Sequence, residues 1–163
     1  MKLRSLSLVV TLLALSLGSI GFGQEAKYGI PSDNKIYAQT LVNKVMATNR
    51  DLVAAGMHVA KPGTDAYKII ATSLNVVGKP CDPSDLEVAV KGKTVINPMP
   101  AAGKFGILLP LRDRSGKHIG GCAVQFKYRD GDNQVKLIVK AYALRDRLAK
   151  QIPDVAELFA PAK

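Results

Sequence analysis

The chain has few of the residues on which metal and cofactor chemistry usually depends. Its 163 residues include only two cysteines, Cys81 and Cys122, and only two histidines, His58 and His118. No C-x-x-C-H motif for haem attachment occurs, and no glycine-rich loop opens a helix, so neither haem attachment nor dinucleotide binding has sequence support. No serine lies in a nucleophile-elbow motif. We therefore expect no enzyme activity, no cofactor and no metal site.

The two cysteines leave several arrangements open. In an oxidising compartment, a disulfide between Cys81 and Cys122 is the favoured arrangement. The alternative is two unpaired cysteines, one of them packed in a sheet. A Cys₂His₂ set formed with His58 and His118 would have the ligand types that zinc prefers, but no local ligand spacing supports it.

The first 23 residues have the three-part pattern of a secretory signal peptide. Lys2 and Arg4 give a short positive segment, and residues 6–20 form an apolar run. Gly21 and Gly23 then place small residues at the two positions that a signal peptidase reads. The apolar run is short for a membrane span, which requires about 20 residues. An uncleaved membrane anchor is the alternative. The sequence therefore predicts a signal peptide over residues 1–23 and a periplasmic or secreted location.

Acidic residues are outnumbered by basic ones, 13 to 23, which gives a formal net charge of +10. Signal-peptide removal takes away Lys2 and Arg4 and no acid, so the charge falls from +10 to +8. The basic residues are scattered and belong to no recognisable nucleic-acid module, so we expect no nucleic acid as a partner. A solvated positive surface that aids solubility explains them.

The N-terminal half of the mature chain is predicted to begin with a long helix. Apolar residues recur near helical spacing over residues 35–55. Ser32 or Asp33 is a candidate cap for its start, and Gly56 fits its end. Residues 57–66 are expected to be irregular or briefly extended.

A strand and a short helix follow in the expected order. Residues 67–73 are rich in β-branched and aromatic side chains and predict a strand. Residues 83–90 predict a short helix, with Asp82 as its cap, Pro83 at its first position and Asp85 three residues after the cap. Capping explains both aspartates without any catalytic role.

Three strands and a final helix complete the predicted order. The strands are expected over residues 94–97, 104–112 and 117–128, and the helix over residues 134–150. The glycine pair at 120–121 indicates a bend or a close backbone approach. Strand alternation predicts two sets of side chains that each share one face: Phe105, Ile107, Leu109 and Leu111; and Cys122, Val124, Phe126 and Tyr128.

This order of elements resembles the PAS-like extracellular sensor domains called Cache domains. The motifs that carry the resemblance are an apolar strand with a proline, a D-x-x-G turn and a strand that opens with I-G: Leu109-Pro110-Leu111, Asp113 to Gly116, and Ile119-Gly120. The stretches 70–73 and 78–79 also resemble the first strand and following loop of single-Cache proteins.

The resemblance covers residues 36–150 and implies an α+β fold. In that fold a long N-terminal helix and a C-terminal helix accompany an antiparallel sheet, and a pocket lies on the other face of the sheet. The expected organisation is a signal peptide, a flexible lead-in over residues 24–34 and one Cache/PAS-like domain over residues 35–163.

The resemblance also implies a ligand pocket beside the segment 75–93. Strand alternation allows either Gln125 with Lys127, or Phe126 with Tyr128, to face this pocket. We favour Tyr128 with Arg112, since a hydroxyl and a cation beside an apolar wall suit a small carboxylate. The alternative is that Arg112 ends a strand in solvent and Tyr128 packs on a helix.

His58 and Tyr67 complete the set of candidate ligand-binding residues. The predicted function is an exported, sensor-like module without its own signalling output, which binds a small organic ligand such as a carboxylate or an amino acid. The alternative function is a protein-interaction accessory of an envelope receptor or transporter, in which the pocket is vestigial.

The processing of the chain can be tested directly. Because residues 1–23 have the signal-peptide pattern, we expect the mature protein to begin at or near Gln24 and to be recovered in the soluble envelope fraction. Mass spectrometry of the exported protein measures this. Recovery of an intact chain beginning at Met1 in the membrane pellet would contradict it and favour the anchor.

Overall fold

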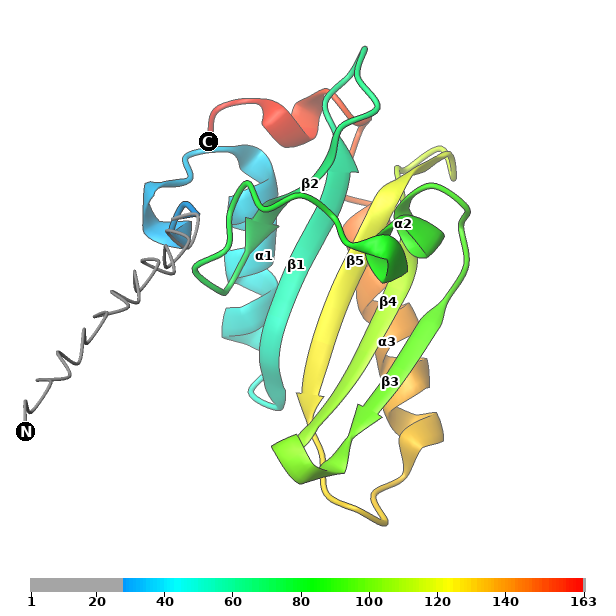
Figure 1. Cartoon of the computed structure of the whole chain (residues 1–163). Coiled ribbons are helices and arrows are strands. Elements are labelled where there is room, and N and C mark those ends of the chain that lie inside the picture. Colours follow the sequence, from blue (N-terminus) through cyan, green and yellow to red (C-terminus); the bar gives the residue numbers. More distant parts are fainter. Residues whose placement is uncertain (1–27, 163) are drawn as a thin grey trace, which may run out of the picture.

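The structure is a computed structural model that describes residues 28–162; the predicted signal peptide lies outside the described residues. It has an α+β architecture with one sheet of five antiparallel strands in the order β2-β1-β5-β4-β3 (Figure 1). Among the described residues, no helix has the length and apolar character needed to cross a membrane. The elements are α1 (Tyr37–Thr48), β1 (Leu52–Ala60), β2 (Tyr67–Thr72), α2 (Pro83–Ala89), β3 (Val95–Met99), β4 (Lys104–Arg112), β5 (His118–Lys127) and α3 (Gln134–Ala149).

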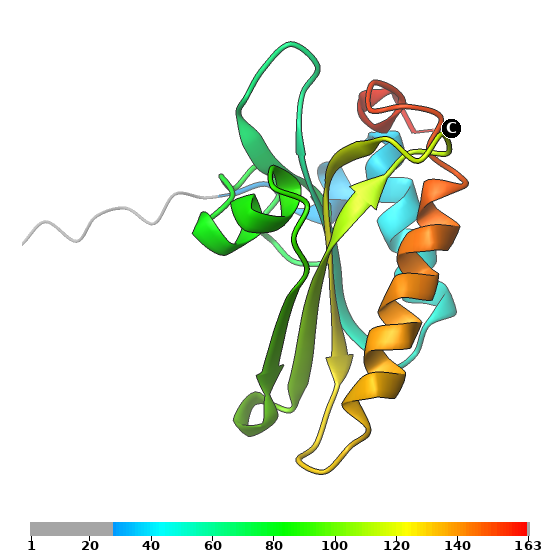
Figure 2. The same cartoon turned by 90° about the vertical axis from the view of Figure 1, so that its right-hand side faces the viewer.

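The hydrophobic core lies between the sheet and the helices α1 and α3, which both cover the same face (Figure 2). The two sets of alternating side chains predicted for β4 and for β5 with the residue after it all belong to this core. On α3 the core side of the helix is formed by Ala141, Leu144 and Leu148, with Leu137 packed at its margin. The short helix α2 lies on the opposite face of the sheet, so the two faces are covered very differently.

The prediction of a long N-terminal helix over residues 35–55 is wrong. Helix α1 ends at Thr48, and the next segment forms β1, a strand next to the centre of the sheet. Most positions of β1 are buried, because α1 packs on one face and α2 approaches the other. A strand buried on both faces has no polar–apolar alternation to distinguish it from a helix. The apolar residues at its start also fit the helical spacing of α1. Gly56, expected at the end of a helix, lies within β1.

The start of α1 is stabilised by the C-terminal segment rather than by a side-chain cap. Neither Ser32 nor Asp33 caps it; Ile36 precedes the first turn and makes no side-chain cap bond. The backbone N–H of Tyr37 instead donates to the carbonyl of Ala160 at 2.8 Å. An orphan donor of the first helical turn is thereby satisfied by a residue more than 120 positions away in the sequence, which sequence periodicity does not reveal.

The glycine pair at the start of β5 permits two close approaches, as the sequence predicted. At Gly121 a Cβ would lie 3.4 Å from Val88 Cγ1 and 3.5 Å from Ala89 Cβ, so α2 rests almost directly on the strand backbone. Gly120 has φ +147°, and a Cβ there would lie 2.5 Å from the carbonyl oxygen of His58. Gly120 therefore requires glycine for both packing and backbone conformation, whereas a Cβ at Gly121 would make ordinary van der Waals contact with α2.

Substitution of Gly120 should show how much the fold depends on this approach. The Gly120→Ala variant should lose at least about 2 kcal/mol of unfolding free energy, since it adds a steric clash to an unfavourable φ. Gly116→Ala is a matched control: its φ is +89° but no atom lies within 4 Å of the added Cβ. It should lose about 1 kcal/mol. Urea unfolding followed by far-UV circular dichroism measures both, and equal losses would contradict the clash.

Candidate functional site

A cavity of about 270 Å³ lies on the face of the sheet that carries α2. Strands β1, β2, β4 and β5 form its floor, and the segment between β2 and α2 forms its wall. Its polar lining groups come from different elements and converge on one space. The lining residues are Ala54, Ala55, Gly56, His58, Ile69, Thr72, Leu74, Val76, Lys79, Asp82, Asp85, Leu108, Ala123 and Gln125.

His58 is the centre of a polar cluster in the wall of this cavity. Its side chain extends from β1 on the α2 side of the sheet and is only 6% exposed. Its Nδ1 lies 3.3 Å from Asp85 Oδ2 and 3.5 Å from Cys81 Sγ. The three ligand-type atoms all lie within 4.8 Å of one another. Sequence analysis named His58 as a candidate pocket residue, but it did not place Cys81 or Asp85 in the pocket.

Asp85 is held in the cluster by the cap of α2, which the sequence predicted. Asp82 Oδ1 accepts a hydrogen bond from the backbone N–H of Asp85 at 3.0 Å. In return, Asp85 Oδ2 accepts one from the backbone N–H of Asp82 at 3.1 Å, which completes a capping box. The same hydrogen bond from the Asp85 N–H, together with one from Ser84, keeps the pKa of the Asp82 carboxyl below its usual range.

The predicted disulfide is not formed: Cys81 and Cys122 are both free thiols. Cys122 belongs to the core on the α1/α3 side of the sheet, whereas Cys81 contacts His58 on the α2 side. The sheet separates them, so no bond can form without rearrangement. Burial raises the pKa of the Cys122 thiol to about 12. Burial, together with the carboxylates of Asp85 and Asp82, also raises the pKa of the Cys81 thiol to about 12.

The cluster has the residue types of a nucleophilic triad but not its geometry. In such a triad the histidine uses one ring nitrogen for the nucleophile and the other for the carboxylate. Here Cys81 and Asp85 both approach Nδ1 of His58. The raised pKa of the Cys81 thiol also opposes formation of a reactive thiolate. The arrangement therefore does not support acyl transfer through Cys81.

The structure does not bring Arg112 and Tyr128 together. Arg112 ends β4 beside His118 of β5, while Tyr128 follows the far end of β5, which pairs with Lys104. These ends are about eight strand residues apart, roughly 25 Å. Arg112 is exposed and donates a hydrogen bond to the carbonyl of Gly116 at 2.7 Å, which closes the β4–β5 turn.

Tyr128 lies on the core side of the sheet and is 4% exposed. Its ring packs against Phe105 at a centroid distance of 5.2 Å, and its hydroxyl accepts a hydrogen bond from Gln134 Nε2 at 2.8 Å. It also borders an open depression of about 480 Å³ at the end of the sheet. Strand alternation allowed either Gln125 with Lys127 or Phe126 with Tyr128 to face the pocket. Phe126 and Tyr128 lie on the core side instead.

Gln125 instead reaches the α2 side and lines the cavity. Tyr67 is half-buried at the start of β2 and pairs with Ala60. It shares the sheet face of His58 by register but is not among the residues that line the cavity. Thr72, which sequence analysis did not single out, lines the cavity from the end of β2. A threonine at a strand end carries no distinctive pattern, so only the sheet pairing reveals its place.

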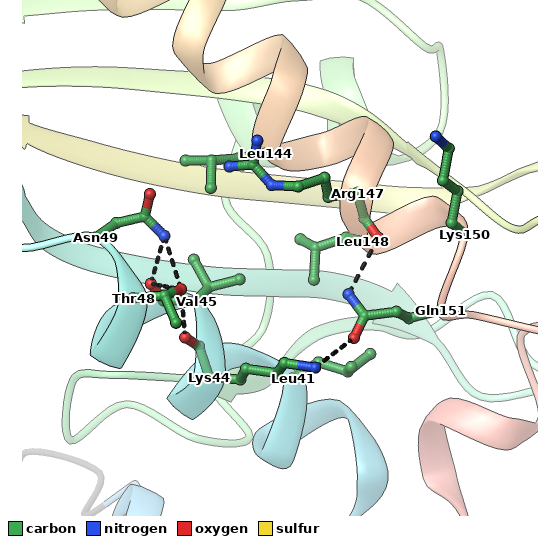
Figure 3. Close-up of a pocket in the computed structure, with 10 residues that line it drawn as sticks. All are labelled: Leu41, Lys44, Val45, Thr48, Asn49, Leu144, Arg147, Leu148, Lys150 and Gln151. Atoms are coloured by element: carbon green, nitrogen blue, oxygen red, sulfur yellow. Dashed lines mark hydrogen bonds between the residues drawn. The ribbon is translucent and has the colours of Figure 1, made fainter.

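A second groove, of about 320 Å³, lies between α1 and α3 on the opposite side of the molecule (Figure 3). Its polar groups mostly serve the helix ends: Asn49 Nδ2 donates to the carbonyl of Val45, and Gln151 Nε2 donates to the carbonyl of Arg147. Lys44 Nζ donates to Gln151 Oε1 at 3.2 Å across the groove. No buried polar group converges on this space among its lining residues, so the cavity beside α2 is the better candidate.

Comparison with solved structures identifies the fold. A GAF sensor protein from Burkholderia vietnamiensis has a TM-score of 0.50 and 19% identity, over 73% of this chain and 76% of that chain. A GAF domain has a TM-score of 0.48 and 17% identity, over 75% and 78%. A type II free methionine-R-sulfoxide reductase from Thermoplasma acidophilum has a TM-score of 0.47 and 18% identity, over 75% and 92%.

The chain therefore has a GAF-like fold within the wider PAS-like group. This is coarser than the expected Cache domain, which the comparisons do not show. No protein-family model matches the chain, and a comparison with curated proteins finds no match. At this level of identity the likeness describes the fold alone.

The state of the two thiols can be tested by their reactivity. In buffer with a chelator at pH 8, both should react slowly with iodoacetamide in the folded protein, although Cys81 is only half-buried. A pKa about three units above the ordinary 9.0 leaves about a thousandfold less thiolate. The rate at Cys81 should rise as the pH approaches 12. In denaturant without reductant, two thiols per chain should titrate rapidly.

Mass mapping after alkylation assigns each rate to its cysteine. A fast-reacting Cys81 in the folded protein would show that its thiol has an ordinary or lowered pKa. The absence of free thiols in the unreduced, denatured protein would show that Cys81 and Cys122 form a disulfide.

Proposed function

We propose that the mature chain is an exported small-molecule-binding module that uses the cavity between the sheet and α2. The observation that carries this proposal is the convergence of polar side chains from β1, β2, β5 and α2 on one cavity, beside an apolar floor. Ligand sites typically combine an apolar wall with a few such fixed polar groups. The GAF-like fold, which the structure shares with a described sensor protein, is consistent with this role.

The charges around the cavity favour a ligand that carries both signs. Asp82 and Asp85 line one side, and Lys79 lines the cavity near them. Gln125 and Thr72 add neutral groups that donate and accept hydrogen bonds. A free amino acid offers an ammonium to the carboxylates and a carboxylate to the lysine. We therefore propose amino acids as the first ligand class to test, ahead of simple carboxylates.

Blocking the cavity should abolish ligand-induced stabilisation. Ala123 is a partly exposed residue of β5 that lines the cavity, so Ala123→Phe places a ring in the binding space. A ligand at a hundred times its Kd adds about 2.7 kcal/mol to stability, which raises Tm by several degrees. A thermal-shift screen of amino acids, amines and carboxylates should find a compound that stabilises the parent chain but not this variant.

Ala102→Phe is the matched control, because Ala102 is exposed in the β3–β4 connection, away from the cavity. It should keep the full ligand shift. Two results would count against the proposal: no stabilising compound in the screen, or a ligand whose shift survives Ala123→Phe in a folded protein.

A protein-interaction role is the second candidate, and one observation favours it. The outer side of α3 carries Val135 and Val139, which are 68% and 63% exposed, and Tyr142 continues the same helical stripe. Apolar side chains gathered on one exposed helix face are typical of a partner surface. A complex that is lost in Val139→Glu, in a chain that binds no small ligand, would support this role over the first.

A further inference from the structure

We infer that His58, Cys81 and Asp85 form a three-ligand site for a divalent zinc-type ion in the wall of the cavity. The sequence alone pointed to no metal site, because the three residues are scattered along the chain. The fold brings them together from β1, the β2–α2 segment and α2. The remaining coordination position is left to water or to a ligand group from the cavity, which His58 and Asp85 both line.

The two separations from His58 Nδ1 match those around a tetrahedral zinc ion, and the third, between Cys81 Sγ and the Asp85 carboxylate, is within 4.8 Å. Zinc binds nitrogen and oxygen at about 2.1 Å and sulfur at about 2.3 Å. Tetrahedral angles then separate a nitrogen and an oxygen ligand by about 3.4 Å, and a nitrogen and a sulfur ligand by about 3.6 Å. The observed separations from His58 Nδ1 are 3.3 Å to Asp85 Oδ2 and 3.5 Å to Cys81 Sγ.

Hydrogen bonds explain only in part why Cys81 and Asp85 both approach Nδ1 of His58. Nδ1 of His58 has either one hydrogen or one lone pair in its ring plane, so it makes one good in-plane hydrogen bond. If Nδ1 donates to Asp85, it has no lone pair for the Cys81 thiol. If Nδ1 instead accepts a hydrogen bond from the thiol, it has no hydrogen to donate to Asp85 Oδ2, which lies 3.3 Å away. A cation between the three atoms removes this conflict, because all three then direct lone pairs at one centre.

The supporting structure holds the ligands in place before any ion arrives. Asp85 Oδ2 is fixed by the backbone N–H of Asp82, and a carboxylate oxygen accepts such a bond while it coordinates a metal. Asp82 is not a fourth ligand through Oδ1, which already accepts from Ser84 Oγ and the Asp85 N–H. The backbone N–H of Cys81 donates to the carbonyl of Tyr67 at 3.1 Å, which ties the cysteine to β2.

The donor set selects the class of ion. Three protein ligands of sulfur, nitrogen and oxygen type with one open position are typical of zinc sites that also bind a small molecule or water. Magnesium and calcium prefer oxygen ligands alone, so this set does not suit them. The carboxylate of an amino acid would occupy this one open position from the cavity side.

Cobalt substitution tests the site without any organic ligand. Co²⁺ added to the chelator-treated protein should bind one ion per chain. It should give the visible bands of tetrahedral cobalt together with a near-ultraviolet sulfur-to-cobalt charge-transfer band. Zinc should displace it, and zinc alone should raise Tm in proportion to the logarithm of its concentration above Kd.

Two ligand variants and two matched controls assign the atoms. Cys81→Ala should remove the charge-transfer band and weaken zinc binding by about a hundredfold or more. Asp85→Asn should also weaken binding, while its amide oxygen still accepts the hydrogen bond from the backbone N–H of Asp82. Cys122→Ala and His118→Gln should bind as the parent does, because Cys122 lies on the other side of the sheet and His118 Nε2 bonds the Gly120 carbonyl.

Several outcomes would overturn the site. These are no cobalt binding by the folded parent, tetrahedral cobalt bands without the sulfur band, or zinc affinity unchanged in both Cys81→Ala and Asp85→Asn. Circular dichroism confirms the fold of each variant. Since these measurements use the metal alone, a failed metabolite screen would leave them unaffected, and the metal site and the proposed function can fail separately.

Discussion

The architecture of the candidate site depends on the contact between α2 and Gly121 of β5. Because Gly121 has no side chain, Val88 and Ala89 sit against the strand backbone and the helix lies close to the sheet. That closeness puts Asp85, on the first turn of α2, within 3.3 Å of His58 on the neighbouring strand β1. A Cβ at Gly121 would already be in van der Waals contact with Val88 and Ala89, so a side chain larger than alanine would displace the helix and move Asp85 away from His58.

Much of the fold follows from local sequence patterns, and the features that do not follow from them depend on contacts made in the assembled structure. The faces predicted for β4 and β5 are confirmed, because both predicted sets of side chains lie in the core. Helix α2 was found from its cap, and α3 from its apolar stripe. The first part of β1, residues 52–55, was mistaken for helix because both faces of the strand are covered. Burial on two sides is a property of the assembled sheet, so the residues of β1 alone do not reveal it.

The candidate site was less predictable than the fold, since its groups come from separated elements. His58 was singled out, but its partner Cys81 was assigned to Cys122, which lies across the sheet. The choice between two cysteines depends on which face each strand or loop presents, and spacing does not encode it. Arg112 and Tyr128 have the right chemistry for a carboxylate ligand, yet they lie at opposite ends of the β4–β5 pair. Residue type indicated the chemistry, and only strand register gave the location.

Asp85 shows why a structural explanation of a residue does not exclude a functional one. Its place three residues after Asp82 accounts fully for its presence as half of a capping box. However, a capping box stabilises a surface helix equally well when its second carboxylate faces solvent. Asp85 is instead only 8% exposed and lies against His58 and Cys81. Burying a carboxylate is costly unless something compensates its charge. The backbone N–H of Asp82 offsets part of that cost, and a cation bound jointly by His58 and Cys81 would offset the remainder.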